Sequence, residues 1–159
     1  MNFINKTKHL SRLSFKYKCW VVFFFFSSLV FSFCLRFIAM SRLAQSMGTS
    51  IGNRQASTLV SDDQLNQAKE MGELMARVAN NTPWECSCLT QAICVKRLLN
   101  WYRVPSILYL GAWFDNTSTQ ASTEFKAHAW VNVRSETVIG GPQNQYYQVV
   151  ASFINLNSH

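Results

Sequence analysis

The strongest constraint on the fold is a change of hydrophobic period at Arg103-Val104-Pro105. Before this point apolar residues recur every three or four positions, which predicts two amphipathic helices, over 61–80 and 87–101. After it apolar residues alternate or cluster in short runs, which predicts strands over 106–114, 124–134, 137–140 and 145–154. Two helices followed by an antiparallel meander of strands indicate an α+β fold.

The positive charge of the chain belongs to its N-terminal part. Residues 1–61 hold eight of the 15 Lys and Arg residues and none of the eight Asp and Glu residues. The remaining residues are close to neutral, which argues against a nucleic-acid-binding domain. We therefore expect a basic and hydrophobic N-terminal segment with a polar connector over 1–60, and one globular domain over 61–159.

An uncharged run of 17 residues, Cys19 to Leu35, dominates the N-terminal segment. As a helix it measures about 25 Å, slightly less than the ~30 Å hydrocarbon core of a bilayer. It is interpreted as a signal anchor, a signal peptide or a helix buried in protein, although no small-residue cleavage site follows it. We expect it to pack against the domain, a partner chain or the membrane surface, with the domain in the cytoplasm; a single-pass membrane protein is the alternative.

Cys88 and His128 are the residues most suited to chemistry. Cys88 lies in the first turn of the second predicted helix, where unpaired amides and the helix dipole favour a thiolate. His128 lies on the second predicted strand and shares a strand face with Trp130 and Asn132, opposite the small apolar residues. If this face looks toward the helix N-terminus, the pair forms a nucleophile and its base.

Metal and cofactor sites are not expected. Cys86, Cys88 and Cys94 have no second cysteine pair and no histidine at ligand spacing. Cys86 is a rival nucleophile, but it precedes the predicted helix. Cys88 is therefore preferred.

Four short motifs resemble the leader peptidase of lasso peptide biosynthesis, a branch of the transglutaminase-like cysteine enzymes. Their order and separation carry the resemblance over about Pro83 to Phe153. The motifs are Pro83-Trp84, Cys88-Leu89-Thr90-Gln91-Ala92, Leu108-Tyr109-Leu110-Gly111 and Ala127-His128-Ala129-Trp130-Val131.

The resemblance implies a transglutaminase-like or papain-like fold, in which Cys88 is the nucleophile and His128 its base. The family usually adds an acid on the next strand, but the corresponding position here is Gly140. Asn132 or Glu136 is a possible replacement; otherwise a backbone carbonyl orients the imidazole or activity is reduced. The Cys88 amide is expected to contribute to the oxyanion site, and Trp84 and Trp130 are expected to wall the cleft.

The function implied by the resemblance is removal of the leader from a ribosomally made precursor peptide. Its partners would be that precursor, a separate leader-recognition protein and an ATP-dependent, asparagine-synthetase-like cyclase, and no cofactor is expected. Two alternatives remain open. One is an acyl or amide transferase that uses the same Cys88–His128 site, and the other is an inactive scaffold or membrane-anchored binding module.

Overall fold

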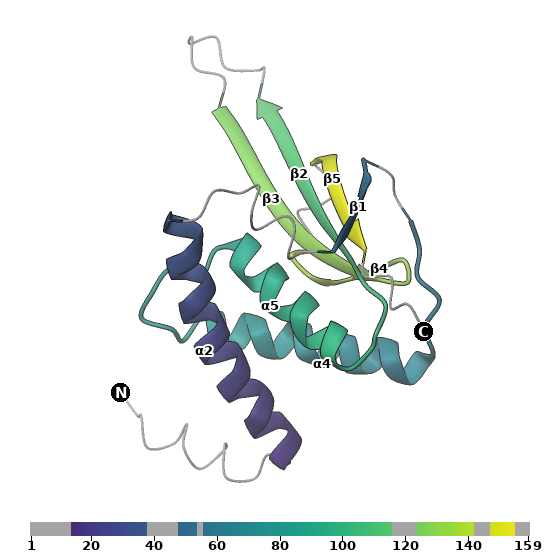
Figure 1. Ribbon diagram of the computed structural model, residues 1–159. Coiled ribbons are helices and arrows are strands. Elements are labelled where there is room, and N and C mark those ends of the chain that lie inside the picture. The colour runs from purple at the N-terminus through teal and green to yellow at the C-terminus, as the bar shows by residue number, and fades with distance from the viewer. Residues whose placement is uncertain (1–13, 38–47, 54–55, 116–123, 142–146, 155–159) are drawn as a thin grey trace.

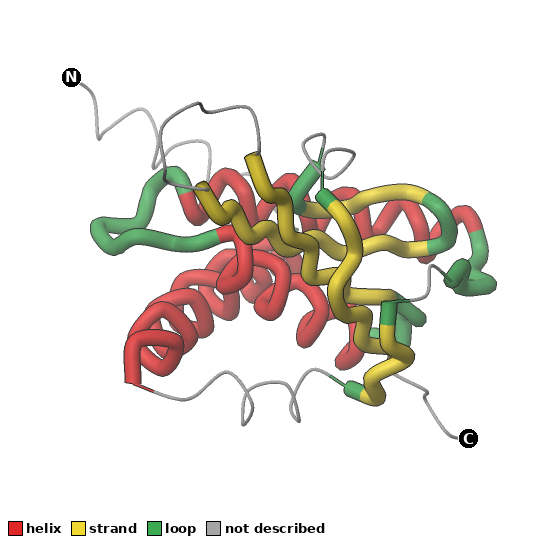
Figure 2. Tube along the Cα trace, turned by 90° about the horizontal axis from the view of Figure 1, so that it is seen from above, coloured by secondary structure: helices red, strands yellow, loops and turns green. Residues whose placement is uncertain are grey.

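Two helices, α4 (Asp62–Ala79) and α5 (Cys88–Trp101), lie against one face of a five-stranded antiparallel sheet in the described part of the chain, and a third, α2 (Phe15–Phe37), packs on these two helices (Figures 1 and 2). This computed structural model describes residues 14–37, 48–53, 56–115, 124–141 and 147–154. The α+β class and the antiparallel pairing are as predicted. The strands are β1 (Thr49–Gly52), β2 (Ile107–Asp115), β3 (Glu124–Val133), β4 (Glu136–Ile139) and β5 (Gln148–Ile154).

Side-chain caps set the starts of α4 and α5. Ser61 and Gln64 form a reciprocal capping box before α4, so that two otherwise unpaired amides find acceptors. Ser87 caps α5 by accepting a hydrogen bond from the Thr90 amide at 3.2 Å. The caps fix Cys88 as the first residue of α5, which confirms the predicted position at a helix N-terminus.

The strand order is β1-β5-β2-β3-β4. The predicted meander is therefore wrong for the last strand, because β5 pairs with β2 and not with β4. The other side of β5 pairs with Thr49–Gly52, a segment predicted to be part of a polar connector. The Ser152 hydroxyl also donates a hydrogen bond to the Gly52 carbonyl at 2.8 Å. These backbone pairings make the segment an edge strand.

The two faces of the sheet bury different sets of side chains. The face toward the helices carries Ala129, Val131 and Val133 of β3 in the main apolar core. The opposite face holds a smaller cluster in which Tyr109 of β2 stacks on Trp130 of β3. The predicted division of β3 into two faces is confirmed for these residues.

The N-terminal helix α2 is part of the main core. It packs against α4 and α5, and Trp20 and Phe24 are almost fully buried there. The Trp20 indole donates a hydrogen bond to the Tyr102 hydroxyl at 2.9 Å. The run Cys19 to Leu35 is expected to pack against the domain, a partner chain or the membrane surface, and in the structure it packs against the domain. The division of the chain at residue 61 stays a prediction.

Candidate functional site

Cys88 begins α5, where the first-turn amides of a helix lack intrahelical partners. Its side chain is half-buried against the main core. The preceding turn is tied down because Gln91 Nε2 donates to the Cys86 carbonyl at 2.9 Å. The backbone thus presents Cys88 at the positive end of a fixed helix.

The other two cysteines of the domain are poor nucleophiles. Burial raises the pKa of Cys86 to about 11 and that of Cys94 to about 12. Both thiols therefore stay protonated at neutral pH, and a protonated thiol is not the reactive form. The raised pKa of Cys86 argues against this residue as the nucleophile.

The ring of His128 is held by a backbone carbonyl. His128 Nε2 lies 2.6 Å from the Gly140 oxygen. Because a carbonyl can only accept, Nε2 carries the proton and Nδ1 keeps its lone pair. Trp130 and Tyr147 lie against the ring, at 6.0 Å and 5.0 Å between ring centroids. The contact therefore fixes the orientation of the ring and leaves Nδ1 outside this hydrogen bond.

Gly140 cannot carry the acid that the resemblance implies at this position. Its φ is +87°, and an added Cβ would lie 2.5 Å from the Ala129 carbonyl oxygen. A side chain is thus excluded by both backbone conformation and space. Its main-chain oxygen makes the contact that an acid would make, one of the arrangements the sequence left open.

Asn132 and Glu136 do not orient His128. The Asn132 amide oxygen accepts a hydrogen bond from Thr137 at 2.9 Å, and Glu136 forms an ion pair with Lys69 of α4. Both side chains are therefore committed elsewhere. Every residue has a backbone carbonyl, so the sequence alone did not identify Gly140 as the partner of His128.

Cys88 lies on α5 and His128 on the neighbouring strand β3, but their side chains contact different residues. α5 packs against β3, and Cys88 belongs to the core on the helix-facing side of the sheet. His128 stacks with Trp130 on the opposite face. In the part of the chain that the structure describes, no hydrogen bond joins the Cys88 and His128 side chains. Their catalytic pairing stays a prediction.

Trp84 and Trp130 lie in different places. Trp84 packs edge-to-face on Phe25 of α2 at 4.9 Å, whereas Trp130 belongs to the cluster on the outer face of the sheet. The two rings therefore have different neighbours, and the expectation that both wall one cleft stays a prediction.

A pocket of about 590 Å³ lies beside the start of α5. Trp84, Ser87 and Thr90 line one part of it, and the C-terminal half of α2 lines the rest, including Phe33 and Arg36. The buried Trp84 Nε1 has no hydrogen-bond partner among the described residues. Sequence reasoning missed this role of α2, because an apolar run alone does not indicate what it packs beside.

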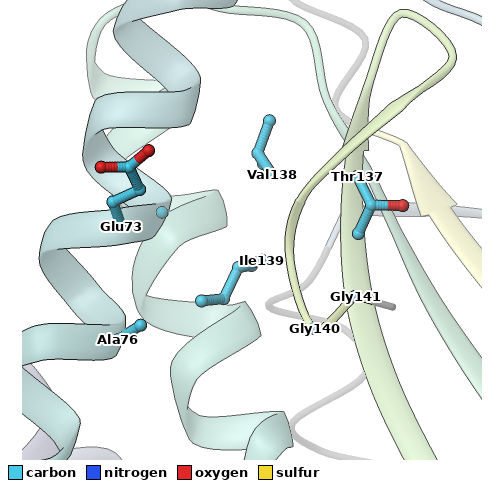
Figure 3. A pocket seen from close by; sticks show the side chains of 8 residues that line it. Glu73, Ala76, Thr137, Val138, Ile139, Gly140 and Gly141 are labelled. Atoms are coloured by element: carbon cyan, nitrogen blue, oxygen red, sulfur yellow. The ribbon is translucent and has the colours of Figure 1, made fainter. Parts of the chain in front are cut away.

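A second pocket, of about 490 Å³, lies between α4 and the end of β4 (Figure 3). Glu73 and Ala76 of α4 form one side, and the backbone from Thr137 to Gly141 forms the other. The segment that supplies the Gly140 carbonyl to His128 is therefore a wall of this pocket. No group of three or more metal-ligating side chains gathers in the described residues.

The model of the transglutaminase-like superfamily matches residues 31–152, most of the chain. The chain belongs to the transglutaminase-like superfamily. The matched region includes Cys88, His128 and the C-terminal part of α2. Members of this superfamily are generally cysteine-dependent enzymes. No curated protein and no solved structure matches the chain.

Proposed function

We propose that this transglutaminase-like protein is a cysteine peptidase that removes the leader from a ribosomally made lasso precursor peptide. The observation that carries the proposal is the position of Cys88 at the N-terminus of α5, next to the strand that bears an oriented His128. The order of the Cys-Leu and His-Ala-Trp motifs supports the choice of substrate.

In the proposed reaction His128 Nδ1 takes the Cys88 thiol proton, and the sulfur attacks the carbonyl carbon of the scissile bond. The oxyanion accepts a hydrogen bond from the Cys88 amide. His128 then returns the proton to the leaving amine as the C–N bond breaks. Water hydrolyses the thioester, with His128 again as base, and the free thiol is regenerated.

This reaction requires Cys88 Sγ and His128 Nδ1 to approach each other when substrate binds. Catalytic hydrogen bonds often form only in the substrate complex. β4 pairs with β3 only as far as Val131. Beyond that residue, the Gly140 turn lies beside the stretch of β3 around His128, and the described residues form no further strand pairing there. A shift of that turn would move the ring relative to α5.

The pocket beside Ser87 suits an extended peptide. Apolar side chains from α2 line it, and Trp84 forms part of its wall. We expect the precursor to bind together with a separate leader-recognition protein. The freed core would then pass to an ATP-dependent cyclase.

Cleavage is tested with the full chain, a precursor peptide and the recognition protein, with products identified by mass spectrometry. We expect free leader and core with one water added. Cys88→Ala should lower the rate by at least about a thousandfold, whereas Cys86→Ala should retain most of it. Equal loss in a folded Cys86→Ala variant would overturn the assignment. A leader joined to an amine would identify a transferase.

The pairing of the two side chains has its own test, the pH profile of Cys88 alkylation by iodoacetamide. A nearby imidazole stabilises the thiolate, so we expect reactivity to persist at lower pH in the wild type than in His128→Ala. An identical profile in both proteins would contradict the pairing. It would favour the second candidate, a binding module without catalysis, which the absence of a Cys88–His128 hydrogen bond supports.

A further inference from the structure

The helix α2 is apolar on all sides, but the domain covers only one of them. Its inner side chains are buried or half-buried against α4 and α5. The outer face remains uncovered, with Phe26 60%, Phe33 66% and Phe37 71% exposed. A helix that is apolar all round is normally buried on every side. The outer face of α2, defined by Phe15, Val22, Phe26, Leu29, Val30, Phe33 and Phe37, is therefore left uncovered by the part of the chain that the structure describes.

The contacts between α2 and the rest of the domain limit how the helix can be placed in a membrane. By length and composition alone, the 23-residue helix is long and apolar enough to cross a bilayer. Contacts to the domain extend along it, from Trp20 with Tyr102 to Ser32, whose hydroxyl donates to the Glu85 carbonyl at 3.0 Å. Crossing with these contacts intact would draw α4, with its exposed Glu73–Arg77 ion pair, toward the hydrocarbon. The helix therefore fits the plane of the interface.

Basic and aromatic side chains flank the outer face. Lys16 and Lys18 are exposed near the start of α2 and Arg36 near its end. Trp101, 76% exposed, lies edge-to-face on Phe23 at the side of the helix. Lysine and arginine attract anionic headgroups, and tryptophan prefers the boundary between headgroups and acyl chains. Residues 1–61 contain no acidic residue, and the acidic side chains beside the start of the helix, Glu70 and Glu73, belong to α4 and lie next to Tyr17.

We propose that the outer face of α2 docks in the plane of an anionic lipid bilayer, with the domain attached to the inner face of the same helix. The docked protein would hold the pocket beside Ser87 close to the bilayer, because Leu29 and Phe33 belong to both the outer face and the pocket lining. The binding partner of the outer face is thus a lipid surface. Binding of a second protein to this face is the outcome that would contradict the proposal.

Binding is measured by flotation of the full chain with vesicles of phosphatidylcholine alone or mixed equally with phosphatidylglycerol. We expect binding to the mixed vesicles that Phe26→Glu/Phe33→Glu weakens by at least about tenfold, through lost apolar burial and added negative charge. The matched control, Leu59→Glu/Val150→Glu, makes the same charge change at exposed apolar residues outside α2 and should bind as the wild type does. Equal binding of the two variants would overturn the proposal, as would a dimer in solution that only the first variant dissociates.

Orientation is tested with a fluorescent amino acid placed at residue 15, 26 or 37 and quenched by lipids that carry a nitroxide at known depth. An in-plane helix should give the same shallow depth at all three positions. A deep central position between two shallow ends would show a spanning helix and refute the in-plane arrangement. Because both measurements use binding alone, a failed cleavage assay would leave their outcome unaffected.

Discussion

The Gly140 carbonyl makes the contact to His128 that an acidic side chain makes in the peptidases this chain resembles. A carbonyl fixes the tautomer of the ring as a carboxylate does, but it brings no negative charge. Its position depends on a left-handed backbone at Gly140 and on the absence of a Cβ next to Ala129. The orientation of the candidate base is therefore a property of the main chain.

Gly140→Ala should move this carbonyl. We expect a loss of about 1–3 kcal/mol in the free energy of unfolding, because alanine at a φ of +87° is strained and its Cβ meets the Ala129 oxygen. Cleavage should fall on the order of a hundredfold, since the ring loses its orienting partner. Gly141→Ala is the control, because its added Cβ would lie 3.4 Å from the nearest atom, Thr137 Cγ2. Equal effects of the two substitutions on denaturation and cleavage would contradict this role of Gly140.

Lys96 of α5 is a charged residue inside the core. It is 3% exposed and donates hydrogen bonds to the carbonyls of Ser106 and Phe153, both at 3.0 Å. It therefore fastens α5 to the start of β2 and to β5. Burial lowers the pKa of Lys96 to about 8 from an ordinary 10.5, since the charged form has lost its hydration.

Lys96→Met should change how stability depends on pH. Between pH 8 and 10.5 the unfolded chain holds this proton while the folded protein releases it, so the Lys96 contribution to stability rises with pH. The wild type should gain up to about 3 kcal/mol relative to the variant across that range, and the difference should be constant below pH 8. Urea denaturation of both proteins at several pH values measures it. A difference that stays constant up to pH 10.5 would rule out the lowered pKa.

At the scale of elements, α2 is a structural part of the domain as well as its candidate membrane contact. Ser27 donates a hydrogen bond to Cys94 Sγ of α5 at 3.4 Å, and Phe24 is fully buried. The superfamily match includes the C-terminal part of this helix. Removing α2 would therefore open the core.

Trp20→Ala should cost about 3–5 kcal/mol in the free energy of unfolding, because it leaves a large cavity in the core and removes the hydrogen bond to the Tyr102 hydroxyl. Val22→Ala on the outer face, where the side chain is 55% exposed, should change stability by less than about 0.5 kcal/mol. Thermal and urea unfolding of the two variants provide the comparison. Similar stabilities would mean that α2 does not hold the domain together in solution.

At the scale of the whole molecule, local sequence signals predicted local structure. The spacing of apolar residues and the change of period placed the helices and most strand positions, because these features depend on neighbouring residues. The place of β5 was not predictable in this way, since alternation indicates a strand but not its neighbours. For the candidate site, the helix position of Cys88 was predictable from the sequence. The Gly140 carbonyl was not, because any residue can supply a main-chain oxygen.

The position of β5 between β1 and β2 also bears on the order in which the protein can assemble. Ser152 and Gly52 are 100 positions apart yet hydrogen-bonded, and β1 pairs with no strand other than β5 among the described residues. During synthesis β1 emerges long before its only neighbour exists, whereas the β2–β3 hairpin and the helices can form from nearby segments. Such long-range pairing closes a large loop and slows folding. Until β5 pairs with β2, the backbone groups on that edge of β2 are unpaired. The newly made protein therefore passes through a stage in which other chains can pair with this edge and aggregate.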